Sequence, residues 1–376
     1  MDALKGIRVV EFTQNLAGPY AGEILGWLGA DVVKVERPGT GDDCRAWGPP
    51  FIRDSSVVFN AMNRTKRSVA IDLKDPTGIA QAAALVAEAD VLVENLRPGS
   101  MEEIGLGPDV LLARHPRLVY GSISAFGRKG ELSRKAGYEE VVQAFSGIFS
   151  INGDEQGRPS RIGSSILDMG TGVWMALGCL GALMRRERTG QGGLVEASLI
   201  ETALGILMQH VGNFTSTGKL PQRTRSATPR VVVCQVFATS DGEIVIVAAN
   251  DRLVVKLARA MGHPEWAQDD RFRTAQARVR NKDLLYGMME PILAADSTSA
   301  WVQRLEAAGV PCAPVNDIGT MLEHPHVAAL DAFDSFEGSD ARFMGLPLSF
   351  DGARPASYRP APRLGEHDAE LLSDRD

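Results

Sequence analysis

Hydrophobic residues form short, unbroken runs in the first third of the chain, and segments with helical spacing lie between these runs. The runs are rich in β-branched residues, as buried strands are, and occupy residues 6–12, 31–36, 67–73, 90–95 and 118–124. Residues 17–29 and 75–89 instead place apolar side chains on one helical face, and Pro76 stands where a first helical turn begins. Alternating strands and helices predict parallel βαβ units, and therefore an α/β fold with a Rossmann-like open sheet.

The pattern changes after residue 130. Two glycine-rich helices are expected, one near 138–149 and one near 168–188, and the second is apolar almost all round, which indicates burial. The segments 231–238 and 243–248 flank a Thr-Ser-Asp-Gly turn and predict a β-hairpin. Helical segments then continue to residue 308, and short strands and loops follow.

These segments predict two domains. A polar, proline-containing connection at 215–230 separates the strand–helix alternation from the hairpin and its helices. We therefore expect residues 1–214 in a large Rossmann-like domain and residues 215–325 in a linker and a smaller α+β domain. Residues 326–376 return to the large domain.

Composition and charge argue against several classes of protein function. The 376 residues carry 40 basic and 47 acidic side chains, a net charge of −7, which argues against a nucleic-acid partner. The four cysteines form no CxxC pair, so we expect neither disulfides nor zinc, and a reducing cytoplasm fits. The N-terminus has no apolar core of a signal peptide, and the longest uncharged stretch, Met169 to Met184, is 16 residues, too short for a membrane span.

Two familiar site types are not supported. Glu36 ends the second strand, where a ribose-binding acid would stand in a dinucleotide site, but the turn after the first strand reads TQNLAGPYAG rather than GxGxxG. His324 and His326 have no cysteine or carboxylate cluster beside them, so we expect no metal site.

Asp168 stands at the expected start of the apolar helix, in the sequence GSSILDMGTG. Its simplest role is to stabilise the helix N-terminus. Its functional role would be that of a carboxylate nucleophile, kept ionised by the helix dipole, with Gly170 and Gly172 giving a bulky ligand access. The residues alone leave both roles open.

Cationic residues gather in two places. Arg64, Lys66, Arg67 and Lys74 form either a solvated cluster or a phosphate site. Arg37 and the segment 95–99 follow strands, and in open α/β sheets the carboxyl ends of strands bind ligands. An anionic, nucleotide-like ligand at that edge is a second open possibility.

Taken together, the segments resemble the family III CoA-transferases, the group that includes formyl-CoA:oxalate and carnitine CoA-transferases. The similarity covers about residues 4 to 330, and no single motif carries it. The matching stretches include FTQNLAGPYAGEILGWLGADVVKVERPGTGDD (12–43), NRTKRSVAIDLKDPTG (63–78), ADVLVENLRPGSMEEIGLG (89–107), AGYEEVVQAFSGIFSING (136–153) and DMGTGVWMALGCLGALMRRERTGQG (168–192).

The resemblance implies transfer of CoA from an acyl-CoA to a small, dicarboxylic acid through covalent aspartyl anhydride and aspartyl-CoA thioester intermediates. Asp168 occupies the nucleophile position. Gln14, with backbone N–H groups around Asn15 and Ala17, is the expected donor to developing oxyanions. CoA and acyl-CoA are then substrates, and no permanently bound cofactor is implied.

The resemblance also places the CoA contacts. Asn15 and Ala17 belong to this set, and the others fall on Arg37, Leu73, Lys74, Asn95, Leu96, Ser100, Lys135 and Tyr138. Two departures stand out. Glu103 replaces an arginine that often meets the diphosphate, so that Arg97 is the candidate substitute, and the segment 223–230 is altered on the acceptor side.

Two alternative functions remain. An α-methylacyl-CoA racemase would need the histidine of a GHD motif, but the corresponding triplet here is Gly137-Tyr138-Glu139. A non-catalytic acyl-CoA-binding homologue would be compatible with the two departures. The resemblance further implies an interlocked homodimer, with Asp168 near the subunit interface.

Overall fold

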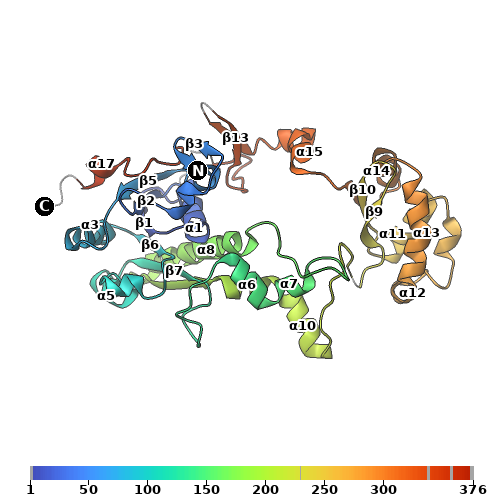
Figure 1. The fold of residues 1–376 in the computed structure, drawn as a ribbon, viewed down its shortest axis with the longest axis horizontal. Helices are drawn as coiled ribbons and strands as arrows, with labels where there is room; N and C mark the ends of the chain where they lie inside the picture. Colours follow the sequence, from blue (N-terminus) through green and yellow to red (C-terminus); the bar gives the residue numbers. More distant parts are fainter. Residues whose placement is uncertain (1–2, 229, 337–338, 356–358, 373–376) are drawn as a thin grey trace. The chain divides into compact units, whose positions relative to one another are not determined.

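The chain divides into two compact units, each with its own core (Figure 1). The computed structural model describes residues 3–228, 230–336, 339–355 and 359–372. Unit 1 comprises Met1–Phe149, Arg161–Leu220 and Ala332–Asp376, and unit 2 comprises Ser150–Ser160 and Pro221–Asp331. Residues 150–160, which the sequence prediction assigns to the large domain, therefore group with the smaller unit.

Unit 1 is built on a six-stranded sheet in which every neighbouring pair is parallel. The strand order is β5-β2-β1-β6-β7-β8. The strands are β1 Arg8–Phe12, β2 Asp31–Glu36, β5 Lys66–Ala70, β6 Val91–Glu94, β7 Val119–Ser124 and β8 Gly193–Ser198. The five apolar runs thus become five of these strands. The sequence missed β8, because this edge strand alternates half-buried and exposed residues instead of forming an apolar run.

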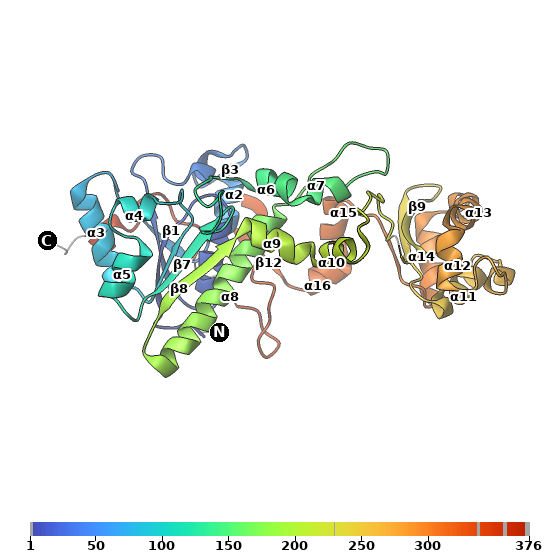
Figure 2. The same cartoon turned by 90° about the horizontal axis from the view of Figure 1, so that it is seen from below.

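Helices cover both faces of this sheet (Figure 2). On one face, α3, α4, α5 and α17 share an apolar core with the strands. On the other face, α1 packs on the first strands and α8 on β7 and β8. The helices of unit 1 are α1 Ala17–Trp27, α2 Val57–Met62, α3 Pro76–Ala87, α4 Ser100–Glu103, α5 Pro108–Arg114, α6 Glu139–Ser146, α8 Ile166–Thr189, α9 Leu199–Ile206, α10 Met208–Thr217 and α17 Asp368–Leu372. Helix α7, Ile148–Ile151, begins in unit 1 and ends in the first segment of unit 2.

Short elements complete unit 1. They are the 3-10 helix η1 at Asp43–Ala46, the β3–β4 pair at Phe51–Ile52 and Ser55–Ser56, and the β12–β13 hairpin at Phe333–Phe336 and Ser339–Met344.

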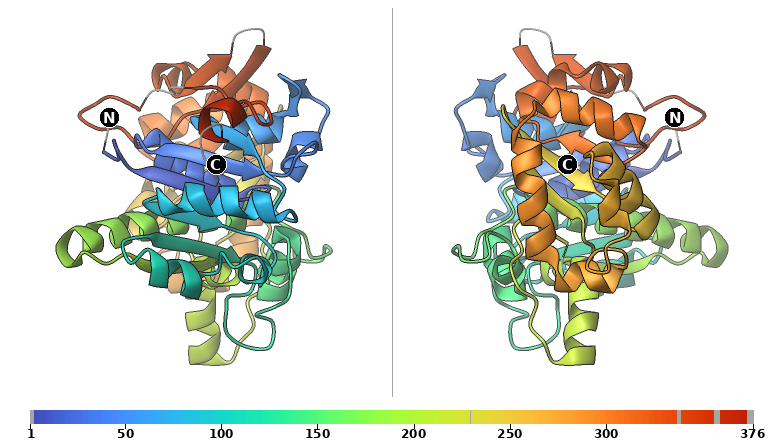
Figure 3. Two further views of the ribbon diagram at one scale, coloured as in Figure 1. Left: turned by 90° about the vertical axis from the view of Figure 1, so that its left-hand side faces the viewer. Right: turned by 90° about the vertical axis from the view of Figure 1, so that its right-hand side faces the viewer.

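Unit 2 is a small antiparallel sheet with helices packed on it (Figure 3, right). Its strands are β9 Cys234–Ala238, β10 Glu243–Val247 and β11 Cys312–Pro314. The predicted hairpin is confirmed, because Glu243 pairs with Ala238 and Val247 with Cys234. The helices are α11 Asp251–Ala260, η2 Pro264–Ala267, α12 Ala275–Arg280, α13 Lys282–Ala294, α14 Thr298–Ala307, α15 Ile318–Glu323 and α16 Pro325–Ala329. The last two lie where the sequence indicated only strands and loops.

The face of the sheet under α1 is charged rather than apolar. Strand residues alternate between faces, and this period directs Glu11, Lys34 and Lys66 toward α1. All three side chains are fully buried, with Lys66 Nζ 2.8 Å and Lys34 Nζ 3.4 Å from the same Glu11 oxygen. Buried charges are stable only when paired in this way.

Glycines let α1 approach these charges. A Cβ added to Gly22 would lie 1.8 Å from the Glu11 carboxylate, and one added to Gly18 would lie 2.9 Å from the Asn95 side chain. Gly172 serves the same purpose on α8, where a Cβ would stand 2.8 Å from the Ala17 carbonyl oxygen. The first turn of α1 and the second turn of α8 are therefore in close contact.

Helix α8 is, by length and composition, apolar enough to cross a membrane, a test that core helices of ordinary globular proteins also pass. Its inner face is buried at Leu167, Met175 and Cys179 against α1 and the strands. The expectation that the glycine-rich apolar segment packs in the interior is confirmed for this face.

Replacing Gly22 with alanine should destabilise unit 1, because the methyl group overlaps a carboxylate that two lysines hold in place. We expect a loss of about 1–3 kcal/mol in the free energy of unfolding, measured by denaturant titration. The control is Gly287→Ala on α13, where a Cβ meets nothing within 4 Å and a gain of about 0.5–1 kcal/mol is expected. Equal effects of the two substitutions would contradict this account of α1.

Candidate functional site

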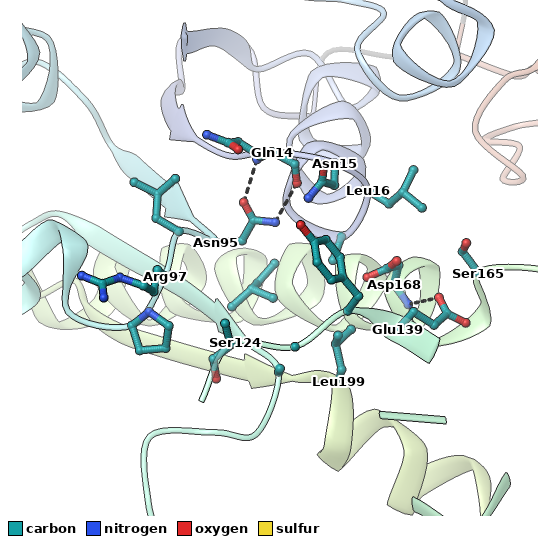
Figure 4. A pocket seen from close by; sticks show the side chains of 18 of the residues that line it. Gln14, Asn15, Leu16, Asn95, Arg97, Ser124, Glu139, Ser165, Asp168 and Leu199 are labelled. Carbon is teal, nitrogen blue, oxygen red and sulfur yellow. Dashed lines mark hydrogen bonds between the residues drawn. The ribbon is translucent and has the colours of Figure 1, made fainter. Parts of the chain in front are cut away.

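Asp168 lies in the first turn of α8, as the sequence predicted, with Ser165 at the N-cap position. A bend at residues 163–164 precedes the helix start. The Asp168 carboxylate points into a cleft whose opposite wall is the loop that carries Gln14 and Asn15 (Figure 4). This cleft, called the Asp168 cleft below, has a volume of about 510 Å³.

The Asp168 cleft lies at the carboxyl ends of the parallel strands. Gln14 follows β1, Asn95 follows β6, and Ser124 ends β7. This is the edge at which open α/β sheets bind ligands. The predicted site residues that line it are Gln14, Asn15, Ala17, Asn95, Leu96, Ser100, Lys135, Tyr138 and Asp168.

A second cleft, called the Arg37 cleft, adjoins the first and has a volume of about 640 Å³. The two clefts share Gln14, Leu96 and Ser100 in their walls. The predicted residues that complete the set here are Arg37, Leu73 and Lys74. All twelve predicted site residues thus line one continuous pair of clefts in unit 1.

The ionisation of Asp168 differs from the expectation of an ordinary, ionised carboxylate. Burial, together with the neighbouring Glu139 carboxylate, raises the pKa of Asp168 to about 7. The Asp168 backbone N–H donates to Glu139 Oε2, which places the two carboxyl groups close together. The helix N-terminus does not offset these two effects.

Glu139 is the main residue that the sequence analysis missed as a functional group. It is buried at the start of α6, and its Oε2 accepts a hydrogen bond of 3.1 Å from the Asp168 backbone N–H (Figure 4). The Gln143 side chain, one turn further along α6, donates to its other oxygen. Its only signal in the sequence was its place in the Gly137–Glu139 triplet.

The loop that carries Gln14 is held by side chains rather than by regular structure. The Gln14 N–H donates to Asn95 Oδ1 at 2.7 Å, and Asn95 Nδ2 donates to the Gln14 carbonyl at 2.8 Å (Figure 4). The Asn15 N–H donates to Asp42 Oδ1 at 3.0 Å, and the Cys44 N–H donates to the same oxygen. The Asn95 amide, predicted to contact CoA, is therefore already engaged with backbone.

The interpretation of Arg64, Lys66 and Arg67 as a solvated cluster or a phosphate site is wrong. All three are buried and paired with carboxylates, namely Arg64 with Glu23 at 3.0 Å, Lys66 with Glu11 and Arg67 with Asp31. The three acids come from different elements, Glu11 from β1, Glu23 from α1 and Asp31 from β2, and only the folded chain brings them to these cations, which sequence spacing does not reveal.

The cations that line the clefts are exposed to solvent rather than buried. Lys74 is exposed in the wall of the Arg37 cleft, and Lys135 is exposed in the wall of the Asp168 cleft. Arg37 is half exposed and pairs with Asp43. These three side chains remain accessible to phosphates.

The structure shows the surroundings of the two departures from the family pattern. Arg97, the candidate substitute for the missing arginine, lies 3.0 Å from Glu103, and both side chains are about 65% exposed. Such a surface pair is weak, so Arg97 stays available to an anion. The described residues of the altered segment, 223–228 and 230, belong to unit 2, where Arg223 donates to the carbonyls of Asp154 and Gly157.

The structure gives no support to the other site types. Glu36, the candidate ribose ligand, is buried and pairs with Arg45 at 2.6 Å. Among the described residues, no group of three or more metal-ligating side chains comes together, and His324 binds only the His326 N–H. No histidine lines the Asp168 cleft, so the second base of a racemase is missing from its walls.

Comparison with known proteins identifies the family of the chain. The model of CoA-transferase family III matches residues 4–368. The chain is 34% identical to the succinyl-CoA:glutarate CoA-transferase of Mus musculus, covering 100% of this chain and 86% of that protein. It is 36% identical to the acetyl-CoA:oxalate CoA-transferase of Acetobacter aceti, covering 98% and 95%.

A solved structure shares the fold. A CAIB/BAIF family protein from Brucella suis superposes with a TM-score of 0.89 at 35% identity, and 99% of each chain is covered. The family model and the relatives both extend over nearly the whole chain, so the match includes the residues of both clefts. The chain belongs to CoA-transferase family III, and it is a CoA-transferase that uses CoA thioesters as substrates.

Proposed function

We propose that this enzyme transfers CoA from an acyl-CoA to a small dicarboxylic acid, and that the transfer passes through covalent intermediates on Asp168. The observation that carries the proposal is the position of the Asp168 carboxylate. It lies in a cleft whose walls contain Gln14 and continue into the Arg37 cleft. A carboxylate nucleophile needs this combination of an accessible oxygen, nearby donors and room for a long cosubstrate.

The chemistry requires four exchanges at carbonyl carbons. The Asp168 carboxylate attacks the donor thioester, which forms an aspartyl-acyl anhydride and releases CoA thiolate. The thiolate attacks the aspartyl carbonyl, which forms an aspartyl-CoA thioester and releases the donor acid. The acceptor carboxylate attacks this thioester, forming a new anhydride and freeing the thiolate again. The thiolate then attacks the acceptor acyl carbon and regenerates Asp168.

Each exchange develops negative charge on a carbonyl oxygen, so donors must face Asp168. The Gln14 side chain lies in the cleft wall on the side opposite α8 (Figure 4). Its amide N–H is the side-chain donor that we assign to the oxyanion, a contribution that in other enzymes amounts to about 10²–10³ in rate. Carboxylates are weak nucleophiles, so holding the reactants in place must contribute much of the rate.

The Arg37 cleft provides the path for the nucleotide part of CoA. Leu73 and Leu96 offer apolar contact, and Arg37, Lys74 and Arg97 carry charge toward phosphates. Lys135 lies nearer Asp168. The ligand would thus extend from the Arg37 cleft, past the shared wall of Gln14, Leu96 and Ser100, to the nucleophile.

The dicarboxylate assignment rests on the named substrates of relatives. The mouse relative is named for glutarate and the Acetobacter relative for oxalate, and each takes CoA from a short acyl-CoA.

An Asp168 pKa near 7 leaves about half of the free enzyme protonated at neutral pH. The nucleophile therefore gains reactivity as the pH rises through 7.

We also propose a homodimer whose interface includes α8 and α10. Trp174, Leu177 and Met184 on α8 are 55–70% exposed, and α10 has no buried residue at all. Both helices contact α9, and exposed apolar side chains at this density are typical of a protein interface. A second copy of the chain is the partner that the family resemblance implies.

Incubation with succinyl-CoA followed by hydroxylamine should convert Asp168 to its hydroxamate, because hydroxylamine captures aspartyl anhydrides and thioesters. Peptide mass spectrometry measures the modification. Asp168→Ala should abolish it and reduce turnover with glutarate by at least 10³-fold. The matched control is Asp109→Ala on α5, which should keep wild-type turnover. Modification that persists in Asp168→Ala would contradict the proposed nucleophile.

Asp168→Asn should stabilise the protein at pH 8 and not at pH 4. The pKa of Asp168 is raised from an unfolded value of about 3.9 to about 7, so the folded state prefers the protonated form. That preference stabilises the fold at low pH and is lost as the pH rises through 7. The neutral amide escapes this loss, on the order of 1–4 kcal/mol at pH 8. Thermal melting at both pH values measures it, and a stabilisation independent of pH would refute the charge argument.

Trp174→Asp combined with Leu177→Asp should produce monomers if α8 lies in the subunit interface. Light scattering after gel filtration measures the mass. Val110→Asp on α5, on the opposite face of the sheet, serves as the matched control and should leave the mass unchanged. A monomeric wild-type protein, or a dimer that survives the double substitution, would contradict this interface.

A further inference from the structure

We propose that Asn95, Asp42 and Lys34 are positioning residues that together hold the backbone on both sides of Gln14 and so fix its side chain in the wall of the Asp168 cleft. The inference rests on the proposed function, in which Gln14 donates to the reacting carbonyl oxygen. None of the three residues needs to touch the substrate for this role. Lys34 and Asp42 lie behind the loop and are buried.

The strongest support is that side chains bind all four polar atoms of the two peptide groups that flank Gln14. In the first group, Lys34 Nζ donates to the Thr13 carbonyl at 2.8 Å, and Asn95 Oδ1 accepts from the Gln14 N–H at 2.7 Å. In the second, Asn95 Nδ2 donates to the Gln14 carbonyl at 2.8 Å, and Asp42 Oδ1 accepts from the Asn15 N–H at 3.0 Å. A turn held this completely cannot rotate either peptide group.

The holding groups are themselves fixed. Lys34 Nζ lies 3.0 Å from Asp42 Oδ2, and both side chains are completely buried. Burial alone would lower the pKa of Lys34, but the carboxylates of Asp42 and Glu11 raise it above its usual value, so the lysine stays charged. A buried ion pair has few alternative arrangements. The pair therefore fixes the position of the loop relative to β2, which carries Lys34.

The loop needs such restraint because its conformation is unfavourable. Asn15 has a φ of 64°, in the left-handed region that side chains other than those of glycine and asparagine rarely adopt. Asn95 is also pressed against α1, since a Cβ on Gly18 would lie 2.9 Å from its side chain. Without its side-chain partners, this segment would relax toward an ordinary φ, and Gln14 would turn away from α8.

Small displacements matter at this position. A donor contributes to catalysis only within about 2.7–3.1 Å of the developing oxyanion, and a misplacement near 1 Å reduces rates by about 10²-fold. Loss of Asn95 or Asp42 should therefore lower kcat and leave binding of CoA nearly intact. The competing role for Asn95, a direct contact to CoA, predicts the opposite: a higher KM with kcat retained.

The test is a double-mutant cycle between Asn95→Ala and Gln14→Ala, with succinyl-CoA and glutarate as substrates in the full-length protein. We expect each single substitution to lower kcat by about 10- to 100-fold, with KM for succinyl-CoA within about threefold of wild type. The double variant should lose no more than the Gln14→Ala variant, because Asn95 acts only through Gln14.

Asp42→Ala completes the cycle from the other peptide group and should show the same dependence on Gln14. This substitution leaves Lys34 without its nearest partner, and its thermal stability is measured in parallel. If the variant does not fold, Asn95→Ala decides alone. Asn60→Ala is the matched control, since Asn60 is buried, binds three backbone carbonyls at 2.9–3.2 Å and lies outside both clefts. Its kcat should stay within twofold of wild type.

Three results would overturn the inference. Losses that multiply in the double variant would show that Asn95 and Gln14 act independently. A raised KM with unchanged kcat would assign Asn95 to CoA binding. An unchanged kcat in Gln14→Ala would remove the residue through which the others are proposed to act. In that last case, hydroxamate formation at Asp168 would still support the proposed transfer mechanism, so the two failures are distinguishable.

Discussion

Close backbone contact between α1 and a charged face of the sheet is the constraint on which the rest of unit 1 depends. Glu11, Lys34 and Lys66 neutralise one another in the layer where a parallel sheet ordinarily buries aliphatic side chains. Only a helix without a side chain at Gly22 can lie over them. The close contact between α1 and the sheet fixes the position of the Gln14 loop that precedes α1. Through Gly172, the contact between α1 and α8 also fixes the distance between this loop and α8.

The Asp168 carboxylate, which we propose as the nucleophile, is held in an environment that opposes its charge. Partial burial and a second carboxyl group raise the pKa of Asp168, whereas the first turn of a helix would lower it. An ordinary surface aspartate would be fully ionised but well solvated, and solvation weakens a nucleophile. Desolvation beside Glu139 instead leaves the ionised form reactive when it does exist. The ionised form of Asp168 is therefore present in a smaller fraction of molecules at neutral pH, but it is a stronger nucleophile than a well-solvated carboxylate.

The sequence predicted the features that depend on local pattern. Five apolar runs became strands, and Asp168 was placed at a helix start, because strand periodicity and helix starts are readable over a few residues. Strand β8 was missed because an edge strand carries a weak pattern. The partners of Arg64 and the raised pKa of Asp168 were missed because they depend on Glu23 and Glu139, which only the folded chain brings near. A lysine and a glutamate inside otherwise apolar strands were the available signal of a buried network.

The burial of Cys44 prevents a side reaction in which a thiol of the protein would capture the acyl group. Its backbone binds Asp42 directly behind the Gln14 loop, yet its side chain is fully buried and its pKa is raised by that burial, so no thiolate forms there. No cysteine lines either cleft. In the proposed mechanism, an acyl group on Asp168 thus meets no sulfur nucleophile from the cleft walls, only the one that arrives with CoA. A protein thiol within reach would instead capture the acyl group as a dead-end thioester, and each such event would remove one enzyme from turnover.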